Sequence, residues 1–219
     1  MKRRTTYDVI RNVHLRHGTP RDGVVEKTIR TAASDSGALC HVVGAPLPGS
    51  IAAGDLIVRL RYADRAAWTA GRGALDAALA GPGVDRFHGA EFGAGTSGSR
   101  TGAADATCYR ALLLRVAPLA VPGEVARFEH DLLTMPRHMS SMRSWHLSRV
   151  DSACGPTTWT HVWEQRFASP EDVTGQYLDH PVHWAVVDKW FDPECPESII
   201  RDRVCHAFCA AGQDVLDRR

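Results

Sequence analysis

The sequence lacks the features that mark several common protein classes. Its formal net charge is only +1, so it has no excess of positive charge of the kind that nucleic-acid binding requires. It contains no run of 18 apolar residues and no apolar signal segment. We therefore expect a soluble, cytoplasmic protein with neither a nucleic acid nor a membrane as partner.

Several sequence motifs of cofactor and catalytic sites are also absent. The six cysteines include no Cys-x-x-Cys pair, which argues against a zinc knuckle or a disulfide framework and favours reduced thiols. No Gly-x-Gly-x-x-Gly follows a predicted strand, and there is no serine nucleophile elbow. A flavin, if used, is therefore not held by a Rossmann unit.

The hydrophobic periodicity of the first half predicts one compact α+β unit. It indicates strands at residues 7–16, 38–44, 55–62 and 84–92, with helices at 22–33 and from 64 onward. The order β-α-β-β-α-β is that of the ferredoxin-like unit. Residues 94–106 are small and polar and include three glycines, which predicts a linker.

The same order is repeated after the linker. The pattern predicts strands at 109–115, 142–150, 158–167 and 200–209, a helix at 124–135 and a broken second helix at 170–177 and 183–190. We therefore predict units at residues 1–93 and 107–219, the first a scaffold and the second carrying the active site. Two tandem ferredoxin-like units can form an intramolecular dimeric α/β barrel.

Aromatic and imidazole side chains are concentrated in the second unit. Five of the six tryptophans and five of the eleven histidines lie between residues 145 and 206. Trp159, His161 and Trp163 are expected to form one wall of a pocket, because alternate side chains of a strand share a face. We expect further pocket groups from the preceding strand and the second helix: Trp145, Tyr177, His183 and Trp184, with His180 at the helix cap.

A neutral histidine near a tyrosine is suited to moving protons at neutral pH. We therefore predict catalytic roles for His183, His161 and Tyr177. The alternative to a catalytic role is that of a structural histidine held by hydrogen bonds. This role is more common, and we expect it of His88 and His206.

Charged residues near the predicted pocket leave two alternatives open. Arg110 begins an inner strand and could meet a substrate oxygen, but we rate pairing with Glu164 across the sheet higher. His161, His180, His183 and Glu164 could in principle bind iron. Strand alternation places Glu164 opposite His161, so we expect no metal.

Two runs carry a family resemblance. Thr160-His161-Val-Trp-Glu, followed by Tyr177-Leu-Asp-His180-Pro-Val-His183, resembles the stress-responsive dimeric α/β-barrel proteins over most of residues 109–209. The resemblance implies that Tyr177 and His183 form an acid-base pair, with His161 as an additional pocket group. Residues 143–151, 159–165 and 183–196 are most similar to two-copy angucycline B-ring-opening oxygenases of the jadomycin, gilvocarcin and kinamycin type.

The closer resemblance implies an oxygenase of antibiotic biosynthesis that cleaves a carbon–carbon bond, in a Baeyer–Villiger-like ring opening. The implied substrate is a polycyclic aromatic polyketide such as dehydrorabelomycin. O2 is the implied oxidant and reduced flavin (FADH2 or FMNH2) the electron source, bound or diffusible, with a flavin reductase as a partner. The resemblance leaves open whether the chain also forms a homodimer.

Two other functions compete with the oxygenase. A cofactor-free polyketide cyclase would use the same Tyr177 and His183 but would need no oxygen. A non-enzymatic protein that binds an aromatic metabolite would need the tryptophans but not the histidines. The fold alone cannot separate these functions.

Overall fold

The chain folds into two α+β units in sequence, and its computed structural model describes residues 6–20 and 23–216. The first unit contains β1 (Tyr7–Leu15), α1 (Val24–Ser34), β2 (Cys40–Gly44), β3 (Leu56–Tyr62), α2 (Arg65–Gly71), α3 (Gly73–Leu79) and β4 (Val84–Phe92). The second contains β6 (Cys108–Val116), α4 (Pro122–His138), β7 (Met142–Arg149), β9 (His161–Phe167), α5 (Pro170–Thr174), α6 (Gln176–Asp179) and β10 (Ile200–Ala210). Asp22, where the first helix was expected to begin, lies outside the described residues.

The strands form two antiparallel sheets, with the orders β2-β3-β1-β4-β8 and β10-β6-β9-β7-β5. Within each unit, the first and third strands lie in the centre and the second and fourth lie outside them. This is the arrangement that the β-α-β-β-α-β order produces. The ferredoxin-like α+β fold predicted from the sequence is therefore confirmed, with two sheets and six α-helices in the described residues.

Two short strands extend the sheets, one from the segment that connects the units and one from the second unit. β5 (Gly95–Ser99) pairs with β7, and β8 (Ser152–Cys154) pairs with β4. The segment 94–106, expected to be only a linker, thus contains a strand. Its small residues allow this, since a Cβ on Gly98 would lie 2.3 Å from the Trp145 ring. Pairing also satisfies the edge of β7, whose backbone groups would otherwise need solvent.

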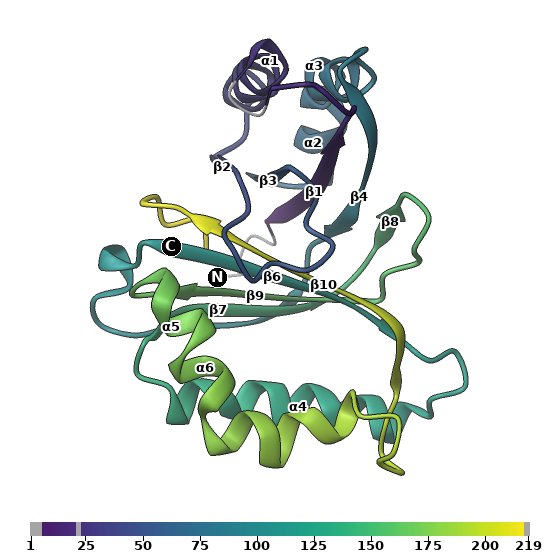
Figure 1. The fold of residues 1–219 in the computed structure, drawn as a ribbon, viewed down its shortest axis with the longest axis vertical. Coiled ribbons are helices and arrows are strands. Elements are labelled where there is room, and N and C mark those ends of the chain that lie inside the picture. Colours follow the sequence, from purple (N-terminus) through teal and green to yellow (C-terminus); the bar gives the residue numbers. More distant parts are fainter. Residues whose placement is uncertain (1–5, 21–22, 217–219) are drawn as a thin grey trace.

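The two sheets face each other, and the helices cover their outer faces (Figure 1). α1, α2 and α3 lie over the first sheet, and α4, α5 and α6 lie over the second. One apolar cluster fills the space between the sheets, with Ile10 and Phe92 from the first unit beside Tyr109, Leu113 and Val162 from the second. None of the helices among the described residues has the length and apolar character needed to cross a membrane.

Buried charges join the two sheets at their centre. Arg59 in β3 donates from Nε to Glu164 in β9 at 3.0 Å, and its Nη2 lies 2.8 Å from Asp8 in β1. Arg61 also contacts Asp8, at 2.8 Å. None of these side chains is more than 2% exposed. Since two carboxylates meet two guanidinium groups, the charges in this inter-sheet ion network balance.

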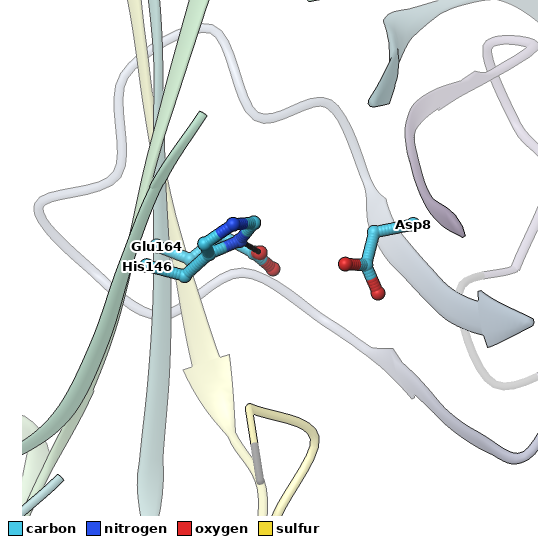
Figure 2. Close-up of side chains that lie close together, drawn as sticks. All are labelled: Asp8, His146 and Glu164. Carbon is cyan, nitrogen blue, oxygen red and sulfur yellow. Dashed lines mark hydrogen bonds and ion pairs between the residues drawn. The ribbon is translucent and has the colours of Figure 1, made fainter. Parts of the chain in front are cut away.

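Two further side chains complete the hydrogen bonding of Glu164. The Tyr109 hydroxyl donates to Oε1 at 2.7 Å, and His146 Nδ1 lies 3.2 Å from Oε2. Figure 2 shows His146 and Glu164 side by side on the second sheet, with the Asp8 carboxylate facing them from the first. Removing one member of such a network leaves an uncompensated buried charge.

We predict that Glu164→Gln lowers the free energy of unfolding by about 3–5 kcal/mol, because Arg59 loses its partner in the second sheet. Guanidinium chloride denaturation, followed by circular dichroism, measures the change. Glu26→Gln is the matched control, since Glu26 pairs with the half-exposed Arg30 one helical turn away. It should cost less than about 1 kcal/mol. Equal effects of the two substitutions would contradict a special role for the inter-sheet network.

The network also predicts how stability depends on acid. Burial alone would raise the pKa of Glu164, but Arg59 and His146 outweigh burial and hold this pKa well below its usual range. An acid whose pKa is depressed by folding stabilises the protein above its unfolded pKa, near 4.3, and loses this effect as the pH falls. The stability difference between wild type and Glu164→Gln should be constant from pH 7 to 5. It should shrink by about 1.4 kcal/mol per pH unit below pH 4. A difference that stays constant down to pH 3 would contradict the assignment.

Candidate active site

Tyr177 and His183 meet over the outer face of the second sheet. α6 ends at Asp179 because Pro181 pushes the preceding residue, His180, into an extended conformation (φ −72°, ψ 133°). The chain then forms a π-helical turn, η2 (His183–Val187), of the kind that often occurs at functional sites. The Tyr177 and His183 rings lie 4.8 Å apart, edge to face, so the structure brings these two residues together.

Arg110 in β6 lies directly beneath this pair. Its guanidinium carbon is 4.5 Å from the centre of the Tyr177 ring, and the side chain is 2% exposed. Nε lies 2.6 Å from His206 Nε2, and Nη1 bonds to the side-chain oxygen of Gln165. Arg110, Tyr177, His183, His206 and Gln165 are called the Arg110 cluster below.

The predicted pairing of Arg110 with Glu164 is wrong. Arg110 lies opposite Gln165 in the β6–β9 register, and Glu164 lies opposite Ala111. Neighbouring residues of a strand point to opposite faces, so Gln165 faces the helices and Glu164 faces the other sheet. There Arg59 of the first unit binds Glu164. The partner of Glu164 is thus in the first unit, and the alternation of residues along β9 does not indicate it.

Arg110 has no carboxylate partner among the described residues, although it is buried. Burial lowers the pKa of its guanidinium, and the adjacent Tyr177 oxygen opposes this shift. Burial, together with the nearby charge of Arg110, also lowers the pKa of His206 to about 2. His206 is therefore neutral at pH 7, and its Nε2 accepts a hydrogen bond from Arg110. An unpaired buried cation favours an anionic guest.

His183 is the member of the cluster with access to solvent. Its side chain is 17% exposed, and Nδ1 lies 3.2 Å from Asp188. Burial lowers the pKa of His183; Asp188 opposes this shift and Arg110 adds to it. The imidazole is thus neutral at pH 7 and can accept a proton.

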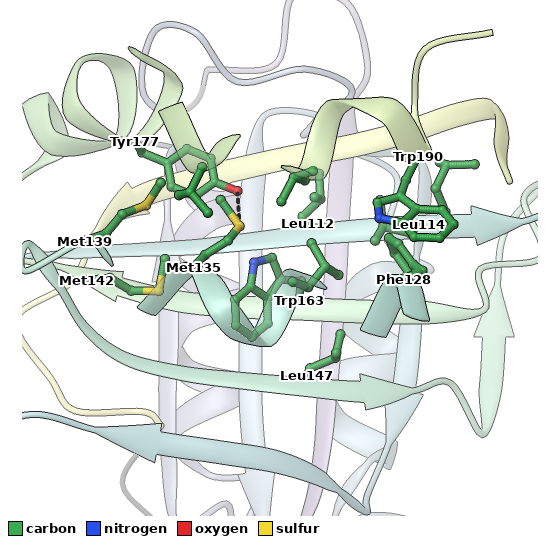
Figure 3. Close-up of a cluster of buried hydrophobic side chains, with 14 of the residues drawn as sticks. Leu112, Leu114, Phe128, Met135, Met139, Met142, Leu147, Trp163, Tyr177 and Trp190 are labelled. Atoms are coloured by element: carbon green, nitrogen blue, oxygen red, sulfur yellow. Dashed lines mark hydrogen bonds between the residues drawn. The ribbon is translucent and has the colours of Figure 1, made fainter. Parts of the chain in front are cut away.

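Soft apolar side chains surround Tyr177. Its hydroxyl contacts the Met135 sulfur at 4.0 Å. Figure 3 shows Met139 and Met142 near Tyr177, on the same side of the apolar cluster beneath the helices. Trp163 is fully buried here, and its indole N–H has no hydrogen-bond partner among the described residues. Trp145 packs at the edge of the same apolar cluster, opposite Gln165 in the sheet register. Trp145 and Trp163 thus both lie on the helix-covered face of the second sheet.

His161 lies apart from the Arg110 cluster. It shares a face with Gln165 but is four residues away along β9, a distance of roughly 13 Å. Its Nε2 is 3.0 Å from Glu129, and its Nδ1 is 2.9 Å from Thr160. Burial lowers the pKa of His161 despite Glu129. His161 and His183 thus do not form one site, and His183 is the histidine next to Tyr177.

Trp159 does not share a wall with His161 and Trp163. β9 begins at His161, so Trp159 belongs to the preceding loop, where strand alternation does not apply. It packs in the cluster between the sheets, whereas Trp163 packs beneath the helices. This prediction was wrong because the strand starts at His161, three residues later than the sequence pattern indicated.

The end of the broken helix also differs from expectation. Trp184 is 59% exposed and does not lean into the site. The His180 imidazole accepts a hydrogen bond from the backbone of Val182 at 3.1 Å, and its ring lies 6.2 Å from that of His138. His180 therefore shapes the turn that presents His183.

Asp8, His146 and Glu164 have ligand atoms within 4.8 Å of one another, as a metal site would require. Arg59 already pairs with both carboxylates, and Arg61 with Asp8. The positive charges of Arg59 and Arg61 already compensate the two carboxylates that a metal ion would need as ligands. We therefore assign these residues to the inter-sheet ion network.

Sequence reasoning missed His206 and Gln165. His206 was expected to be structural, because a lone buried histidine on a terminal strand is more often a hydrogen-bonded structural residue than a catalyst. The ferredoxin-like order gives a usable signal, since it places the fourth strand of a unit beside the first. β10 must therefore lie next to β6, and alternate residues of both strands share the helix-covered face.

Comparisons with known proteins support the architecture. Residues 108–205 match the family model described as the stress responsive A/B barrel domain. No curated protein matches the chain in sequence. The match covers the strands and helices that carry Tyr177 and His183.

Solved structures resemble the chain over both units. An anthrone oxidase-like protein has a TM-score of 0.63 at 8% identity, covering 95% of this chain and 92% of its own. A candidate monooxygenase from Fusobacterium nucleatum subsp. nucleatum has 0.60 at 10%, with 96% and 94% covered. A candidate monooxygenase from Lactobacillus acidophilus NCFM has 0.57 at 10%, with 94% and 96% covered. At these identities the likeness shows the fold alone. The second unit is thus similar to the stress responsive A/B barrel domain, and the whole chain shares the fold of these three proteins.

Proposed function

We propose that the chain is an oxygenase that acts on an electron-rich, polycyclic phenol or hydroquinone at the Arg110 cluster. The observation that carries this proposal is the buried, unpaired charge of Arg110 beside Tyr177 and a neutral His183. A phenolate would supply the missing negative charge. The names of the structural neighbours, anthrone oxidase-like and monooxygenase, support the same class of chemistry.

In the proposed mechanism, His183 removes a phenolic proton from the substrate. Arg110 and the Tyr177 hydroxyl, which already lie close to His183, stabilise the resulting oxyanion. Loss of this proton makes the ring electron-rich enough to reduce O2. A carbon–oxygen bond then forms at a ring carbon, with O2 reduced to the peroxide and the ring oxidised by two electrons.

We further propose that the peroxide opens the ring in a Baeyer–Villiger-like step. The peroxide oxygen attacks an adjacent carbonyl carbon, the neighbouring carbon–carbon bond migrates to oxygen, and the O–O bond breaks. Dehydrorabelomycin, an angucyclinone of antibiotic biosynthesis, has the phenolic rings that this chemistry needs. The tryptophans of the site, Trp163 and Trp145, would hold the planar rings.

The residues of the cluster do not fit a tightly held flavin. They offer one cation, and the described residues around them contain no glycine-rich loop that could cradle a pyrophosphate. Reduced flavin is therefore proposed only as a source of electrons in solution, where a reductase would maintain the substrate as the hydroquinone. No step at the Arg110 cluster depends on it.

We propose that a ring system reaches the Arg110 cluster when the covering segment moves. None of the four described cavities is lined by Tyr177, His183 or Arg110. α5 and α6 are short and are separated by Gly175 in an unusual conformation (φ −108°, ψ −97°). The unbranched methionines near Tyr177 can repack around a guest. We propose that this segment opens to admit the substrate.

The architecture suggests how one chain could form a barrel that otherwise needs two chains. We propose that the two units are the intramolecular counterpart of a dimeric α/β barrel, with the first unit as scaffold. The short strands β5 and β8 and the inter-sheet ion network support this proposal.

The proposal is tested with dehydrorabelomycin, a flavin reductase, reduced flavin and 18O2, with mass spectrometry of the product and an anaerobic control. We expect a ring-opened product that contains the label and no product without oxygen. An unlabelled product formed without oxygen would indicate a cyclase instead. Binding without any product would indicate a carrier.

Variants identify the base in the same assay. We predict that His183→Gln lowers kcat by about 10²–10⁴-fold, the usual contribution of a positioned base. Arg110→Gln should lower it by about 10²-fold or more, because it removes the charge that stabilises the oxyanion. His161→Gln is the matched control and should lower kcat by less than about tenfold, since His161 lies outside the cluster. Full activity of a folded His183→Gln variant would overturn the assignment.

A further inference from the structure

A second cavity lies where the two units meet, away from the Arg110 cluster. Its volume is about 460 Å³, within the range of small-molecule sites. Both units line it, with His14, Ile51, Ala52, Arg86 and His88 from the first and Pro156, Thr157, Trp159 and Val204 from the second. It adjoins a shallower cavity of about 610 Å³ that shares His14 and Ala52.

His88 lines this cavity and carries an unused acceptor beneath its surface. Its Nε2 lies 2.9 Å from the carbonyl oxygen of Ala52 and must carry the proton, because a carbonyl can only accept. Burial lowers the pKa of His88, so its ring is neutral at pH 7. Nδ1 therefore has a free lone pair, and it has no hydrogen-bond partner although the residue is only 8% exposed.

The backbone at Ala52 is held in an unfavourable conformation. Its φ of +57° lies in the left-handed region and is the only positive φ of a non-glycine residue among those described. The Ala52 carbonyl also lies 3.4 Å from the Cys205 sulfur of the second unit. Strain of this kind persists where the surrounding structure imposes it, and it is more frequent at ligand sites. Here it aims the carbonyl that fixes the tautomer of His88.

Trp159 supplies a flat wall and an unused donor. It is 5% exposed, and its indole N–H has no hydrogen-bond partner among the described residues. The ring lies 5.8 Å from that of His88. A phenolic hydroxyl can donate to a free imidazole nitrogen and accept from an indole N–H. Ile51 and Val204 add apolar surface on which an aromatic ring can pack.

Positive charge lies at the rim of the same cavity. The Arg86 side chain is 60% exposed, and it pairs with the half-exposed Asp85 at 2.7 Å. Exposed pairs of this kind contribute little, so Arg86 can turn toward a ligand at small cost. Its Nη2 also lies 3.4 Å from His14 Nδ1. The cavity thus has an exposed arginine at its rim, and its lining residues His88 and Trp159 carry an unused acceptor and an unused donor beneath the surface.

We propose that this cavity is a second ligand site, which binds a planar, fused-ring phenol with an acidic group at its opposite end. The phenol enters between Trp159 and the apolar side chains and bonds to His88 Nδ1. The acidic group remains at the rim beside Arg86. This inference does not depend on the proposed oxygenation, because none of its residues belongs to the Arg110 cluster.

Isothermal titration calorimetry of the full chain with 6-hydroxy-2-naphthoate tests the proposal. We expect one ligand per chain at this cavity. 2-Naphthoate, which lacks the hydroxyl, and 6-methoxy-2-naphthoate, which cannot donate, should bind about fivefold to tenfold more weakly, as expected for one lost hydrogen bond. Equal binding of all three compounds would overturn the assigned role of His88.

Variants locate the bound compound. His88→Phe and Trp159→Phe should each weaken binding about fivefold to tenfold, and Arg86→Gln should weaken it about threefold or more. The matched controls His17→Phe and Trp184→Phe are at exposed positions and should leave binding unchanged. Tyr177→Phe should also leave it unchanged.

Two results would overturn this inference. One is the absence of binding at millimolar concentrations of 6-hydroxy-2-naphthoate. The other is weakening by Tyr177→Phe but not by Trp159→Phe or Arg86→Gln, which would place the compound at the Arg110 cluster. If His88→Phe does not fold, the other two variants and the three naphthoates still provide the test.

Discussion

The ion pair between Arg59 and Glu164 is the constraint on which the arrangement of the two units depends. It joins β3 of the first unit to β9 of the second at 3.0 Å, with both side chains fully buried. Buried charges are costly unless they are paired and hydrogen-bonded. Here Asp8 adds a second carboxylate to Arg59, and Tyr109 and His146 add hydrogen bonds to Glu164. The two sheets therefore cannot slide past each other without exposing an unpaired charge to the apolar cluster between them.

This constraint reaches the candidate site through a single strand. Glu164 points from β9 toward the first unit, while the residues on either side of it, Trp163 and Gln165, point toward the helices. Fixing Glu164 thus fixes the floor of the Arg110 cluster. The first unit contributes no residue to the Arg110 cluster. Through Arg59 and Glu164, however, it contacts the opposite face of β9, the strand that carries Gln165. A scaffold unit can in this way influence chemistry that it does not touch.

The sequence was informative where structure is decided locally and misleading where it is decided by distant contacts. Alternating strands, the proline after His180 and the ferredoxin-like order were predictable because they depend on neighbouring residues. The partner of Arg110 was not, since it depends on the register between β6 and β9 and on Arg59 from the other unit. Trp159 was misplaced for a similar reason, because the exact start of β9 decides its face. The contact between Tyr177 and His183 was expected from the family resemblance. The contact between His206 and Arg110 was not expected, because no neighbouring residue in the sequence indicates it.

The two buried arginines at the centre of the chain differ in a way that bears on function. Arg59 faces two carboxylates, so its charge is compensated within the protein. Arg110, one strand away from Glu164, meets only neutral groups among the described residues: Gln165, His206 and the Tyr177 ring. A buried cation without a carboxylate partner lowers stability. We propose that a bound anion offsets this cost at Arg110. The same reasoning separates the two proposed sites. We propose that the Arg110 cluster takes an anion that forms within the protein, whereas the His88 cavity, with Arg86 at its rim, takes a ligand that arrives already charged.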